Sequence, residues 1–447
     1  TSRGLGDVYK RQFMNGYIGL DFATQSARAI VINDSAQILT RISTELEPVI
    51  TIGKSRTQNP ASWISALNFL LKSVAEFCEA NSVTPVVLSM TATSGTFLLT
   101  DEKNVPTTAA IMYNDGTADS PLERAALLNQ TETYFKHVPE YLISYLTGSE
   151  KIPADWSHAL KSGFDLDTKA WNVKTNLKLP DVVAPGEYLG EISDSFPLKG
   201  LKIFAGMTDG CTGQISAGGS RVGSAVSTIG TTLVLKLVSD RNISGPGFYS
   251  HLLPNETWLS GGASNLGGIS LNRFGDLDKL NRLAENYGPA NRVVYPLEGV
   301  GERFPIADPA LIKLESDKPT NTVEEFRSIL EGIAFAEKYA YQILHNAGGP
   351  NLKTLNTVGG GSKSKLWSEI RATVLDLEIV SQSEAGSDLG AAMIALAGYR
   401  GGNLSEQLAK IPLQSGEIIY PNSNQKNKLN ENYSRFLELI HRSHKDL

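Results

Sequence analysis

Two segments far apart in the chain share one pattern of apolar and polar residues. Each has a short apolar run, a polar turn and a second apolar run: residues 17–33 (YIGLDFATQSARAIVIN) and residues 224–238 (SAVSTIGTTLVLKLV). Short apolar runs on either side of a turn rich in Thr, Ser and Gly predict strands joined by a hairpin. The same shape in both parts of the chain predicts two related halves.

Other segments carry apolar residues at the spacing of a helix. The expected helices are residues 60–80, 122–128, 133–146, 323–347, 365–375, 390–398 and 430–442. Shorter apolar runs predict strands at residues 86–89, 96–99, 109–113, 202–207 and 355–358. Strands mixed with helices in both half-chains predict an α/β protein with two lobes.

A segment rich in Pro, Gly and Asp, residues 181–201, is typical of a connector between domains. We therefore expect an N-terminal domain over residues 15–200 and a C-terminal domain over residues 201–447. The opening stretch is polar and has no apolar run resembling a signal peptide. Met14 directly precedes the first strand-like run and is expected to be the natural start, so residues 1–14 are interpreted as a non-native or disordered leader.

Charge and composition exclude several classes of protein. The net charge of −6 argues against a nucleic-acid partner, because a phosphate backbone requires a basic face. No apolar run approaches the roughly 18 residues of a membrane span, which excludes a membrane partner. Cys78 and Cys211 have neither paired nor metal-ligand spacing, which favours a reducing compartment and a cytoplasmic location.

The first turn, residues 21–26 (DFATQS), could hold magnesium and phosphate. Asp21 ends the predicted strand, where its carboxylate can hold the metal directly or through water. The backbone N–H groups of the turn and the Thr24 hydroxyl can face phosphate oxygens. The alternative is a capped hairpin turn, a role that Asp and Thr often have.

Two further turns have the chemistry of a nucleotide site. Residues 228–232 (TIGTT) combine Gly230, which permits a close approach of the backbone, with the hydroxyls of Thr231 and Thr232. Residues 359–362 (GGGS) follow a strand and precede a helix whose first N–H groups are free to bind a ligand. Plain turns explain either segment alone, whereas one phosphate turn in each half would suit a triphosphate held from two sides.

Asp209 is the candidate general base. It follows a predicted strand and is flanked by glycines (AGMTDG), so it can face a ligand and accept a proton from a hydroxyl. The alternative is a cap for a helix at residues 212–217. His158 and His251 lack metal-ligand spacing and are interpreted as surface or structural residues, with a smaller chance that His158 lies near a sugar. Trp156 and Phe164 are expected in the core.

Taken in this order, these segments resemble the FGGY carbohydrate kinases. The resemblance extends from about Tyr17 to the closing helix and is far more specific than any single motif. Residues 21–24 look like the family's first phosphate motif and residues 227–232 like its second. Residues 359–367 (GGGSKSKLW) resemble its adenosine motif, and Asp209 stands where the family has its catalytic Asp.

The resemblance implies two RNase H-like domains of the actin/hexokinase-like ATPase superfold, with a cleft between them. It also implies an ATP-dependent kinase that uses Mg²⁺ and acts on a small sugar, as a monomer or homodimer. The residues expected to bind ATP or magnesium are Asp21 (also the metal ligand), Thr24, Gly230, Thr231, Thr232, Gly360, Gly361 and Ser362. Those expected to contact the sugar are Ser94, Asp115 and Asp209, with Asp209 catalytic.

Within the family, the chain is most similar to the plant and cyanobacterial D-ribulose kinases. The stretches that carry this likeness are residues 93–96 (TSGT), 260–268 (SGGASNLGG) and 301–309 (GERFPIADP). Xylulose kinases typically have Gln-Met-His-Gly where this chain has residues 92–95, which favours D-ribulose. The expected reaction is therefore the conversion of D-ribulose to D-ribulose 5-phosphate.

Three departures separate the chain from that branch. Thr91 stands where the branch has Asp, Ala23 stands where Gly is usual, and the segment between Asp115 and Ala154 is shorter by about one helix. D-xylulose or glycerol kinase is the alternative activity. An actin-like nucleotide-binding module and an inactive sugar-binding pseudokinase are the alternatives of other classes.

Overall fold

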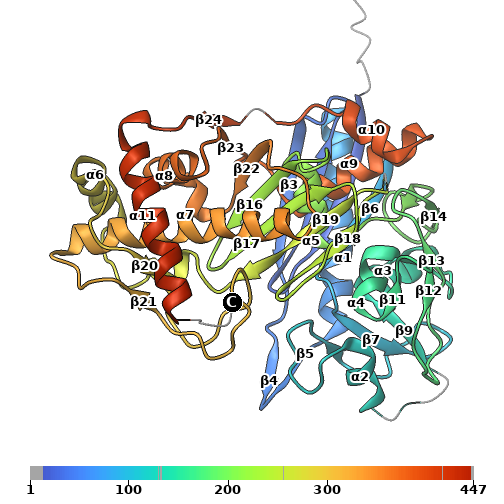
Figure 1. Cartoon of the computed structure of the whole chain (residues 1–447). Helices are drawn as coiled ribbons and strands as arrows, with labels where there is room; N and C mark the ends of the chain where they lie inside the picture. The colour runs from blue at the N-terminus through green and yellow to red at the C-terminus, as the bar shows by residue number, and fades with distance from the viewer. Residues whose placement is uncertain (1–13, 129, 131–132, 255, 415, 444–447) are drawn as a thin grey trace, which may run out of the picture. The chain divides into compact units, whose positions relative to one another are not determined.

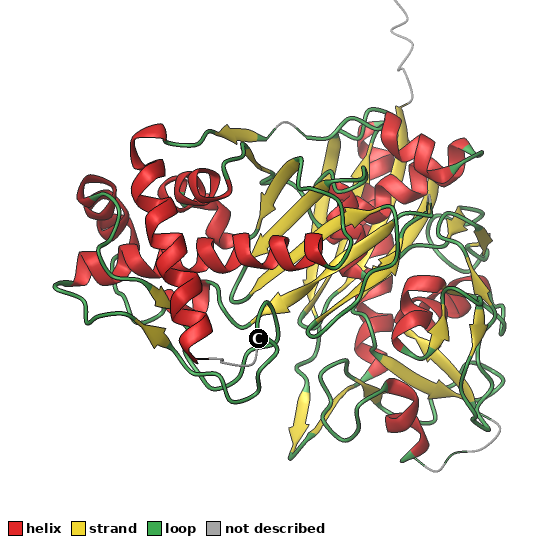
Figure 2. Ribbon diagram, in the orientation of Figure 1, coloured by secondary structure: helices red, strands yellow, loops and turns green. Residues whose placement is uncertain are grey.

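The computed structural model describes residues 14–128, 130, 133–254, 256–414 and 416–443 (Figure 1). The chain divides into two units. The first comprises residues 1–213 and 386–412, and the second comprises residues 214–385 and 413–447. Each unit combines strands with helices (Figure 2), as the α/β prediction requires.

The main sheet of the first unit has six strands in the described part of the chain, in the order β14-β15-β6-β1-β2-β3. β1 pairs in parallel with β6 and antiparallel with β2, and β15 pairs in parallel with β6. The bounds are β1 (Met14–Phe22), β2 (Ser26–Ile32), β3 (Ile38–Glu45), β6 (Val83–Ala92), β14 (Tyr188–Glu191) and β15 (Lys202–Phe204). Three parallel strands therefore direct their carboxyl ends to one edge of this sheet.

Alternation along β1 buries both faces of this sheet. Ile18 and Leu20 belong to the core that includes Trp63 and Leu67 of α1 (Pro60–Asn81). Gly19 points to the other face, where α9 (Ser387–Arg400) packs so closely that an added Cβ would lie 2.1 Å from a backbone oxygen of that helix. A glycine at this position lets the helix lie directly on the strand.

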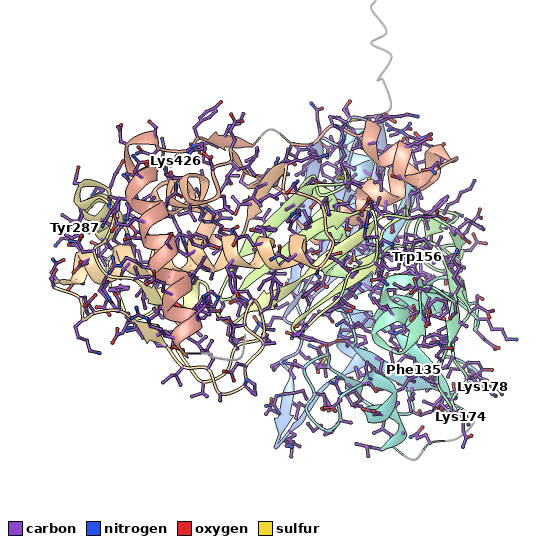
Figure 3. All side chains as sticks on the ribbon, viewed as in Figure 1. Phe135, Trp156, Lys174, Lys178, Tyr287 and Lys426 are labelled. Carbon is purple, nitrogen blue, oxygen red and sulfur yellow. The ribbon has the colours of Figure 1, made fainter. Side chains whose placement is uncertain are left out.

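A second part of the first unit surrounds a smaller sheet, ordered β4-β5-β8-β7-β9 among the described residues. Phe135 of this sheet is buried, whereas Lys174 and Lys178 are exposed on the surface of the unit (Figure 3). The strands of this part are β4 (Ile50–Ile52), β5 (Ser55–Gln58), β7 (Phe97–Thr100), β8 (Ala110–Ile111), β9 (Tyr134–His137), β10 (Ala154–Asp155), β11 (Phe164–Asp165), β12 (Ala170–Trp171) and β13 (Val182–Val183). The remaining helices of the first unit are α2 (Pro121–Ala126), α3 (Val138–Thr147), α4 (Trp156–Lys161), α10 (Leu404–Lys410) and the start of α5 (Asp209–Ser216).

The second unit has a seven-stranded sheet in its described residues, ordered β18-β19-β17-β16-β22-β23-β24. Its strands are β16 (Ser224–Ile229), β17 (Leu233–Ser239), β18 (Phe248–Leu252), β19 (Trp258–Ser264), β22 (Thr354–Val358), β23 (Ile379–Ser381) and β24 (Glu417–Ile419), with a separate pair of β20 (Val294–Tyr295) and β21 (Leu314–Glu315). Its helices are α6 (Leu277–Tyr287), α7 (Thr322–Asn346), α8 (Lys365–Leu375) and α11 (Ser423–Ser443). The apolar faces of α7, α8 and α11 meet the sheet in one continuous core.

The two main sheets repeat one arrangement. In the first unit the pairs on one side of β1, with β6 and then β15, are parallel, and the pairs on the other side, with β2 and then β3, are antiparallel, in the order β15-β6-β1-β2-β3. In the second unit β16 has the same neighbours, in the order β23-β22-β16-β17-β19. The expectation of two related halves is confirmed at the level of strand order.

The division of the chain differs from the expected boundary between residues 200 and 201. β15 adds to the first sheet rather than starting the second, and α9 returns to pack on β1 and β6. Local sequence cannot show these contacts, because β6, which β15 joins, and β1, on which α9 packs, lie more than 100 and more than 350 residues earlier in the chain. Of the expected leader, residues 1–13 lie outside the described residues, and Met14 is the first residue of β1.

Two predicted elements were wrong, and a third was correct but too short. The first part of the helix expected at residues 133–146 is β9, which pairs with β7, and the helix α3 starts at Val138. The expected connector at residues 181–201 contains β14, an edge strand of the main sheet. The helix expected at residues 430–442 begins at Ser423. No helix in the described residues is long and apolar enough to cross a membrane.

Candidate active site

Asp21 lies at the carboxyl end of β1, where the side chain is 3% exposed. One of its carboxylate oxygens, Oδ1, is buried and has no hydrogen-bond partner among the described residues. The turn that follows is closed by the N–H of Ala23, which donates to the carbonyl of Ser26. Gln58 holds the turn by donating to the carbonyl of Thr24 at 3.0 Å. The prediction of a tight turn after Asp21 is confirmed.

Burial and nearby carboxylates perturb Asp21. Burial is the largest cause, and the charges of Asp209 and Asp388 add to it, so the pKa of Asp21 rises to about 7 while Arg28 opposes the rise. A buried carboxylate with a raised pKa and an unpartnered oxygen is a group that a cation would stabilise. Asp21 therefore has the electrostatic properties expected of a magnesium ligand.

Asp209 is the first residue of α5 and is half-buried. Its carboxylate accepts from its neighbour, the N–H of Gly210, at 2.7 Å. The carbonyl of the preceding residue, Thr208, accepts the N–H groups of Cys211 and Thr212 and so begins the helix. Asp209 thus lies inside the first turn of the helix, and the residue that precedes the helix, where a cap would stand, is Thr208.

The groups around the Asp209 carboxylate have opposite effects on its pKa. Burial raises the pKa of Asp209, while the amides of Gly210 and Ser94 and the charge of His158 lower it, and the net direction is upward. A carboxylate that is partly desolvated yet still hydrogen-bonded by N–H groups can hold a substrate hydroxyl and accept its proton. Since the charge of Asp209 raises the pKa of Asp21, the two carboxylates lie within electrostatic reach of each other.

Ser94 lies beside Asp209, and its expected contact with the sugar stays a prediction. It lies in the turn between β6 and β7, its amide donates to Asp209, and its buried hydroxyl has no partner among the described residues. Thr91, the residue that departs from the family pattern, is the register partner of Asp21 on β6. Its hydroxyl lies 3.1 Å from that of Thr212, which connects the end of β6 to the helix of Asp209.

Asp115 behaves as a structural residue. Its Oδ2 accepts from the N–H of Arg56 at 2.6 Å, and its Oδ1 accepts from the N–H of Thr117 at 2.9 Å. Burial raises its pKa, but the bonds from Thr117 and Arg56 outweigh burial and lower it. None of the hydrogen bonds and ion pairs of Asp115 in the described residues involves Ser94 or Asp209. Its role in sugar binding stays a prediction.

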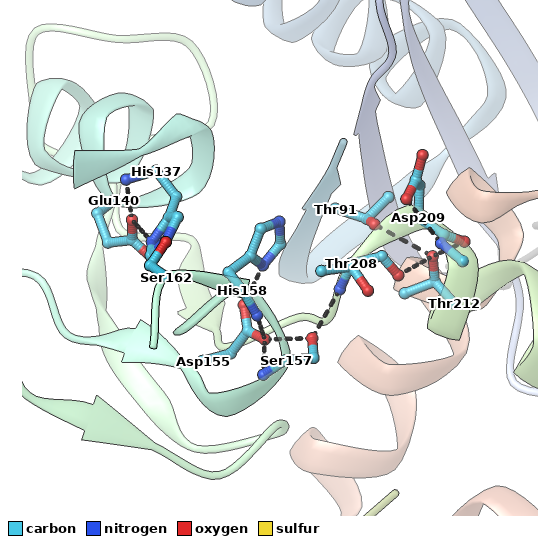
Figure 4. Close-up of polar contacts among 11 residues, drawn as sticks. Thr91, His137, Glu140, Asp155, Ser157, His158, Ser162, Thr208, Asp209 and Thr212 are labelled. Carbon is cyan, nitrogen blue, oxygen red and sulfur yellow. Dashed lines mark hydrogen bonds and ion pairs between the residues drawn. The ribbon is translucent and has the colours of Figure 1, made fainter. Parts of the chain in front are cut away.

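His158 and Asp155 are buried beside this site, and sequence reasoning gave them little weight (Figure 4). His158 is 0% exposed, which corrects the surface interpretation. Its Nδ1 lies 2.5 Å from Oδ2 of Asp155, and the amide of Thr208 donates to the hydroxyl of Ser157 at 2.8 Å. The signal available in the sequence was Asp155-Trp156-Ser157-His158 itself, in which three polar residues stand at the start of a short helix. His251, also interpreted as surface or structural, is buried in β18.

In the second unit the turn after β16 is supported from behind by a glycine pair. The N–H of Gly268 donates to the carbonyl of Gly230 at 2.8 Å, and that of Ile269 donates to the carbonyl of Thr231 at 3.1 Å. A Cβ on Gly267 would lie 2.7 Å from the carbonyl oxygen of Thr231. The SGGASNLGG stretch therefore supports the second turn, a contact that the sequence did not predict.

The glycine triplet packs on that same turn. Gly359 has a φ of +93°, and an added Cβ there would lie 2.5 Å from the carbonyl of Ile229. A Cβ on Gly361 would lie 2.4 Å from the Ile229 side chain, whereas one on Gly360 would meet nothing within 4 Å. Two of the glycines therefore permit close packing, and the third, Gly360, leaves its backbone open.

A cavity of about 380 Å³ opens between these turns within the second unit, and Gly230, Thr231, Gly360 and Gly361 line it. This volume is in the range of small-molecule sites. Four more lining residues lie in stretches that the sequence singled out: Ile229, Gly268, Ser364 and Trp367. Sequence reasoning missed the rest: Ile269, Leu271, Asn272, Leu277, Asn281, Phe326 and Leu330. Several of them lie on α6 and α7, which the sequence pattern did not connect with a ligand.

Two expected ligand residues do not line the cavity. Thr232 lies at the end of the second turn, outside the lining. The hydroxyl of Ser362 donates to the carbonyl of Gly359 at 2.8 Å and so closes the glycine turn on itself. The neighbouring hydroxyl that does line the cavity is that of Ser364, which donates to Oδ1 of Asn281.

The residues present fit a magnesium ion held together with phosphates. No cluster of three or more His, Cys, Asp or Glu that could bind a metal occurs in the described residues. Mg²⁺ usually keeps several waters and is bound by one or two carboxylates plus substrate phosphates. The unpartnered oxygen of Asp21 matches that pattern, and a fully protein-ligated ion does not.

Comparison with known proteins decides the family. The N-terminal domain of the "FGGY family of carbohydrate kinases" matches residues 16–150, and its C-terminal domain matches residues 225–399. Together the two matches cover more than two thirds of the chain. The chain belongs to the FGGY family of carbohydrate kinases.

Relatives and solved structures match along almost the whole chain. A xylulose kinase of Staphylococcus epidermidis is 23% identical over 96% of this chain and 97% of its own. The structure of a ligand-bound xylulose kinase from Lactobacillus acidophilus has a TM-score of 0.85 at 19% identity, covering 97% of this chain and 99% of its own. A glycerol kinase from Plasmodium falciparum with ADP has a TM-score of 0.83 at 17% identity, covering 95% and 98%.

These findings confirm the α/β fold with two domains of the actin/hexokinase-like superfold. The protein is an ATP-dependent sugar kinase, a phosphotransferase with an alcohol group as acceptor. Because kinases of two different substrates match almost equally well, the fold alone does not decide the sugar.

Proposed function

We propose that this kinase transfers the γ-phosphoryl group of ATP to a hydroxyl of a ketopentose, with Asp209 as the base. The observation that carries the proposal is the position of Asp209. Its partly buried carboxylate lies at the start of α5, receives the amides of Ser94 and Gly210, and lies within electrostatic reach of Asp21. Asp21 and Asp209 lie near the carboxyl ends of the parallel strands of the first sheet, where α/β proteins commonly bind ligands.

Each group has a separate task in this proposal. Asp209 orients the sugar hydroxyl and takes its proton, which makes a poor nucleophile competent at neutral pH. Asp21 and Thr24 would hold magnesium and phosphate, and Thr231 and Thr232 would hold phosphates from the second unit. When bound, magnesium would neutralise the charge of the phosphates. The adenosine would occupy the cavity at Gly360 and Gly361.

D-ribulose is the sugar we propose, and D-xylulose is the second candidate. The turn at residues 92–95 favours D-ribulose, because Ser94 stands where xylulose kinases typically have His. The buried, unpartnered Ser94 hydroxyl beside Asp209 gives that turn a polar group for a sugar. D-xylulose is supported by the xylulose kinases among the relatives.

The test is the release of ADP by the purified protein with Mg-ATP and one of three acceptors: D-ribulose, D-xylulose or glycerol. The expected result is the highest kcat/KM with D-ribulose. An equal or higher value with D-xylulose would overturn the assignment to D-ribulose and leave a pentulose kinase. No stimulation by any of these acceptors, with sugar binding intact, would support the inactive pseudokinase instead.

A further inference from the structure

A buried pair of residues outside the proposed machinery connects directly to Asp209. Asp155 and His158 are 4% and 0% exposed, and they lie on β10 and α4 in the first unit. Asp155 is the cap of α4: its Oδ1 accepts from the N–H groups of Ser157 and His158 at 2.9 and 3.1 Å. Its other oxygen, Oδ2, lies 2.5 Å from Nδ1 of His158. Asp155 thus holds both the backbone and the imidazole of this segment.

Ser157 extends this arrangement to the start of α5. Its hydroxyl donates to Oδ1 of Asp155 at 2.5 Å and accepts from the N–H of Thr208 at 2.8 Å. The carbonyl of Thr208 in turn begins α5, whose first residue is Asp209. A continuous series of buried hydrogen bonds therefore connects Asp155 with the backbone that carries the proposed base (Figure 4).

His158 has one ring nitrogen that the protein does not use. Its Nε2 is buried and has no hydrogen-bond partner in the described residues. The whole side chain is 0% exposed, so we assign to it an effect on the reaction that passes through neighbouring groups. A buried imidazole against a carboxylate is expected to carry a proton, which places a positive charge in this wall of the site.

We propose that Asp155 and His158 form a positioning pair for Asp209, with Asp155 holding the start of α5 through Ser157 and keeping His158 as the cation that supports the Asp209 carboxylate. The proposal rests on Asp209 being the base of the proposed reaction. Asp155 and His158 are positioning residues in this account, since neither touches the reacting atoms.

The charges around the pair agree with this role. Burial lowers the pKa of His158, but Asp155, Glu140 of α3 and Asp209 outweigh burial and raise it to about 8. On the side of Asp209, His158 lowers the pKa that burial raises. The charge of Asp209 also reaches Asp21 of β1, whose pKa is further influenced by Asp388 of α9 and Arg28 of β2. Lys161, also on α4, interacts with Cys211 of α5.

The neighbouring His137 provides a matched control. Its ring lies 5.7 Å from that of His158, it is equally buried, and its Nδ1 lies 2.9 Å from Oε2 of Glu140. Its Nε2, in contrast, lies 2.9 Å from the Ser162 hydroxyl. His158→Asn and His137→Asn therefore make the same chemical change in the same cluster, each keeping a donor near the Nδ1 position.

The experiment compares the pH profile of kcat/KM for the best sugar in the wild type and the two variants, together with their melting temperatures. We expect His158→Asn to move the acidic limb of the profile to higher pH by roughly one unit, as expected when a carboxylate loses an opposite charge nearby. Below that limb the loss of kcat/KM is then about tenfold. His137→Asn should lower the melting temperature and leave the limb in place. An unmoved limb in folded His158→Asn, or an equal movement in both variants, would overturn the proposal.

A second measurement needs neither turnover nor a folded His158 variant. The titration of the His158 imidazole can be followed by long-range ¹H–¹⁵N NMR in the wild type and in Asp209→Asn. We expect the pKa of His158 to fall when the Asp209 charge is removed, and an unchanged pKa would overturn the coupling. If no sugar stimulates ATP turnover, the proposed function fails, and this titration still decides whether the two groups are coupled.

The hydrogen-bonded part of the proposal can be separated from the charge. Ser157→Ala removes the acceptor of the Thr208 amide and leaves His158 and Asp155 in place. We expect a lower kcat with an unmoved acidic limb, because the base is displaced while its charge partner remains. An unchanged kcat in Ser157→Ala would show that the connection to Thr208 does not position Asp209.

Discussion

The two hairpin turns at the centres of the two sheets have the same place in the fold and different chemistry. The turn after β1 begins with Asp21, a buried carboxylate with an unpartnered oxygen and a pKa raised to about 7. The turn after β16 has no carboxylate: it presents Gly230, Thr231 and backbone groups, and glycines pack behind it. A repeated fold thus carries charged chemistry in one unit and a neutral ligand cavity in the other. Breaking the first turn should affect the reaction, and breaking the second should affect nucleotide binding and stability.

The largest expected effect is at Asp209, which belongs to the charged side of this comparison. Asp209→Asn keeps the size of the side chain and can hydrogen-bond a sugar, but it cannot accept a proton. We expect kcat to fall by about 10²- to 10⁴-fold with little change in nucleotide affinity. Steady-state kinetics and nucleotide titration measure the two effects separately. Near-normal turnover in a folded variant would leave Asp209 with a structural role only, since Asn is as compatible with a helix start as Asp.

The second prediction is that a substitution at Asp21 has opposite effects on turnover and on stability. Its pKa rises from 3.8 to about 7 on folding, so the folded state binds more protons than the unfolded state between these values. The free energy of unfolding therefore falls as pH rises through that window, and the full cost applies above pH 7. Asp21→Asn should abolish magnesium-dependent turnover yet raise the melting temperature of the ligand-free protein at pH 8. The stabilisation is on the order of a few kcal/mol.

The control for Asp21→Asn is the same comparison at or below about pH 3, under both pKa values, where the gain in melting temperature should disappear because both states bind the proton. A variant that is less stable than the wild type at pH 8 would contradict the electrostatic account of this site.

The third prediction concerns the neutral turn and uses two adjacent glycines. Gly359→Ala places an alanine at a φ of +93° and puts its Cβ 2.5 Å from the carbonyl of Ile229. Because both the backbone strain and the close contact destabilise the folded state, the free energy of unfolding should fall by about 1 kcal/mol or more. Gly360→Ala meets nothing within 4 Å and should leave stability unchanged, while its methyl group projects near the lined cavity. Denaturant unfolding and ADP titration distinguish them. Equal losses of stability in both variants would refute the packing role assigned to Gly359.

The smallest effect on catalysis is expected at Asp115. Its pKa is lowered on folding, so its contribution to stability is present above the pKa of the unfolded state and is lost as pH falls through the folded value. Asp115→Asn should lower the melting temperature at pH 7 and change the KM for the sugar little, because both carboxylate oxygens are occupied by Arg56 and Thr117. A large rise in KM with an unchanged melting temperature would restore Asp115 to the sugar site.

Much of the fold was predictable because its signals are local. The hairpins at residues 17–33 and 224–238, the long helices α1 and α7, and the boundary of α8 follow from alternation and helical spacing within short windows. The strand β9 was missed because its apolar residues suit a helix equally well, and only pairing with β7 decides between the two. The return of α9 to the first sheet was missed for the same kind of reason, since its partner β1 is remote in the chain.

The sequence by itself determined the candidate chemistry: Asp21 at a strand end, Asp209 between glycines, two turns rich in Thr and Gly, and a glycine triplet before a helix. Only the tertiary structure decided how these groups are used. It buries Asp21 against other carboxylates, closes Ser362 on its own turn, occupies both oxygens of Asp115, and brings Asp155 and His158 beside the start of α5. The physical reason is that burial, unpartnered oxygens and charge coupling depend on neighbours from distant parts of the chain, whereas turn and strand preferences depend on adjacent residues.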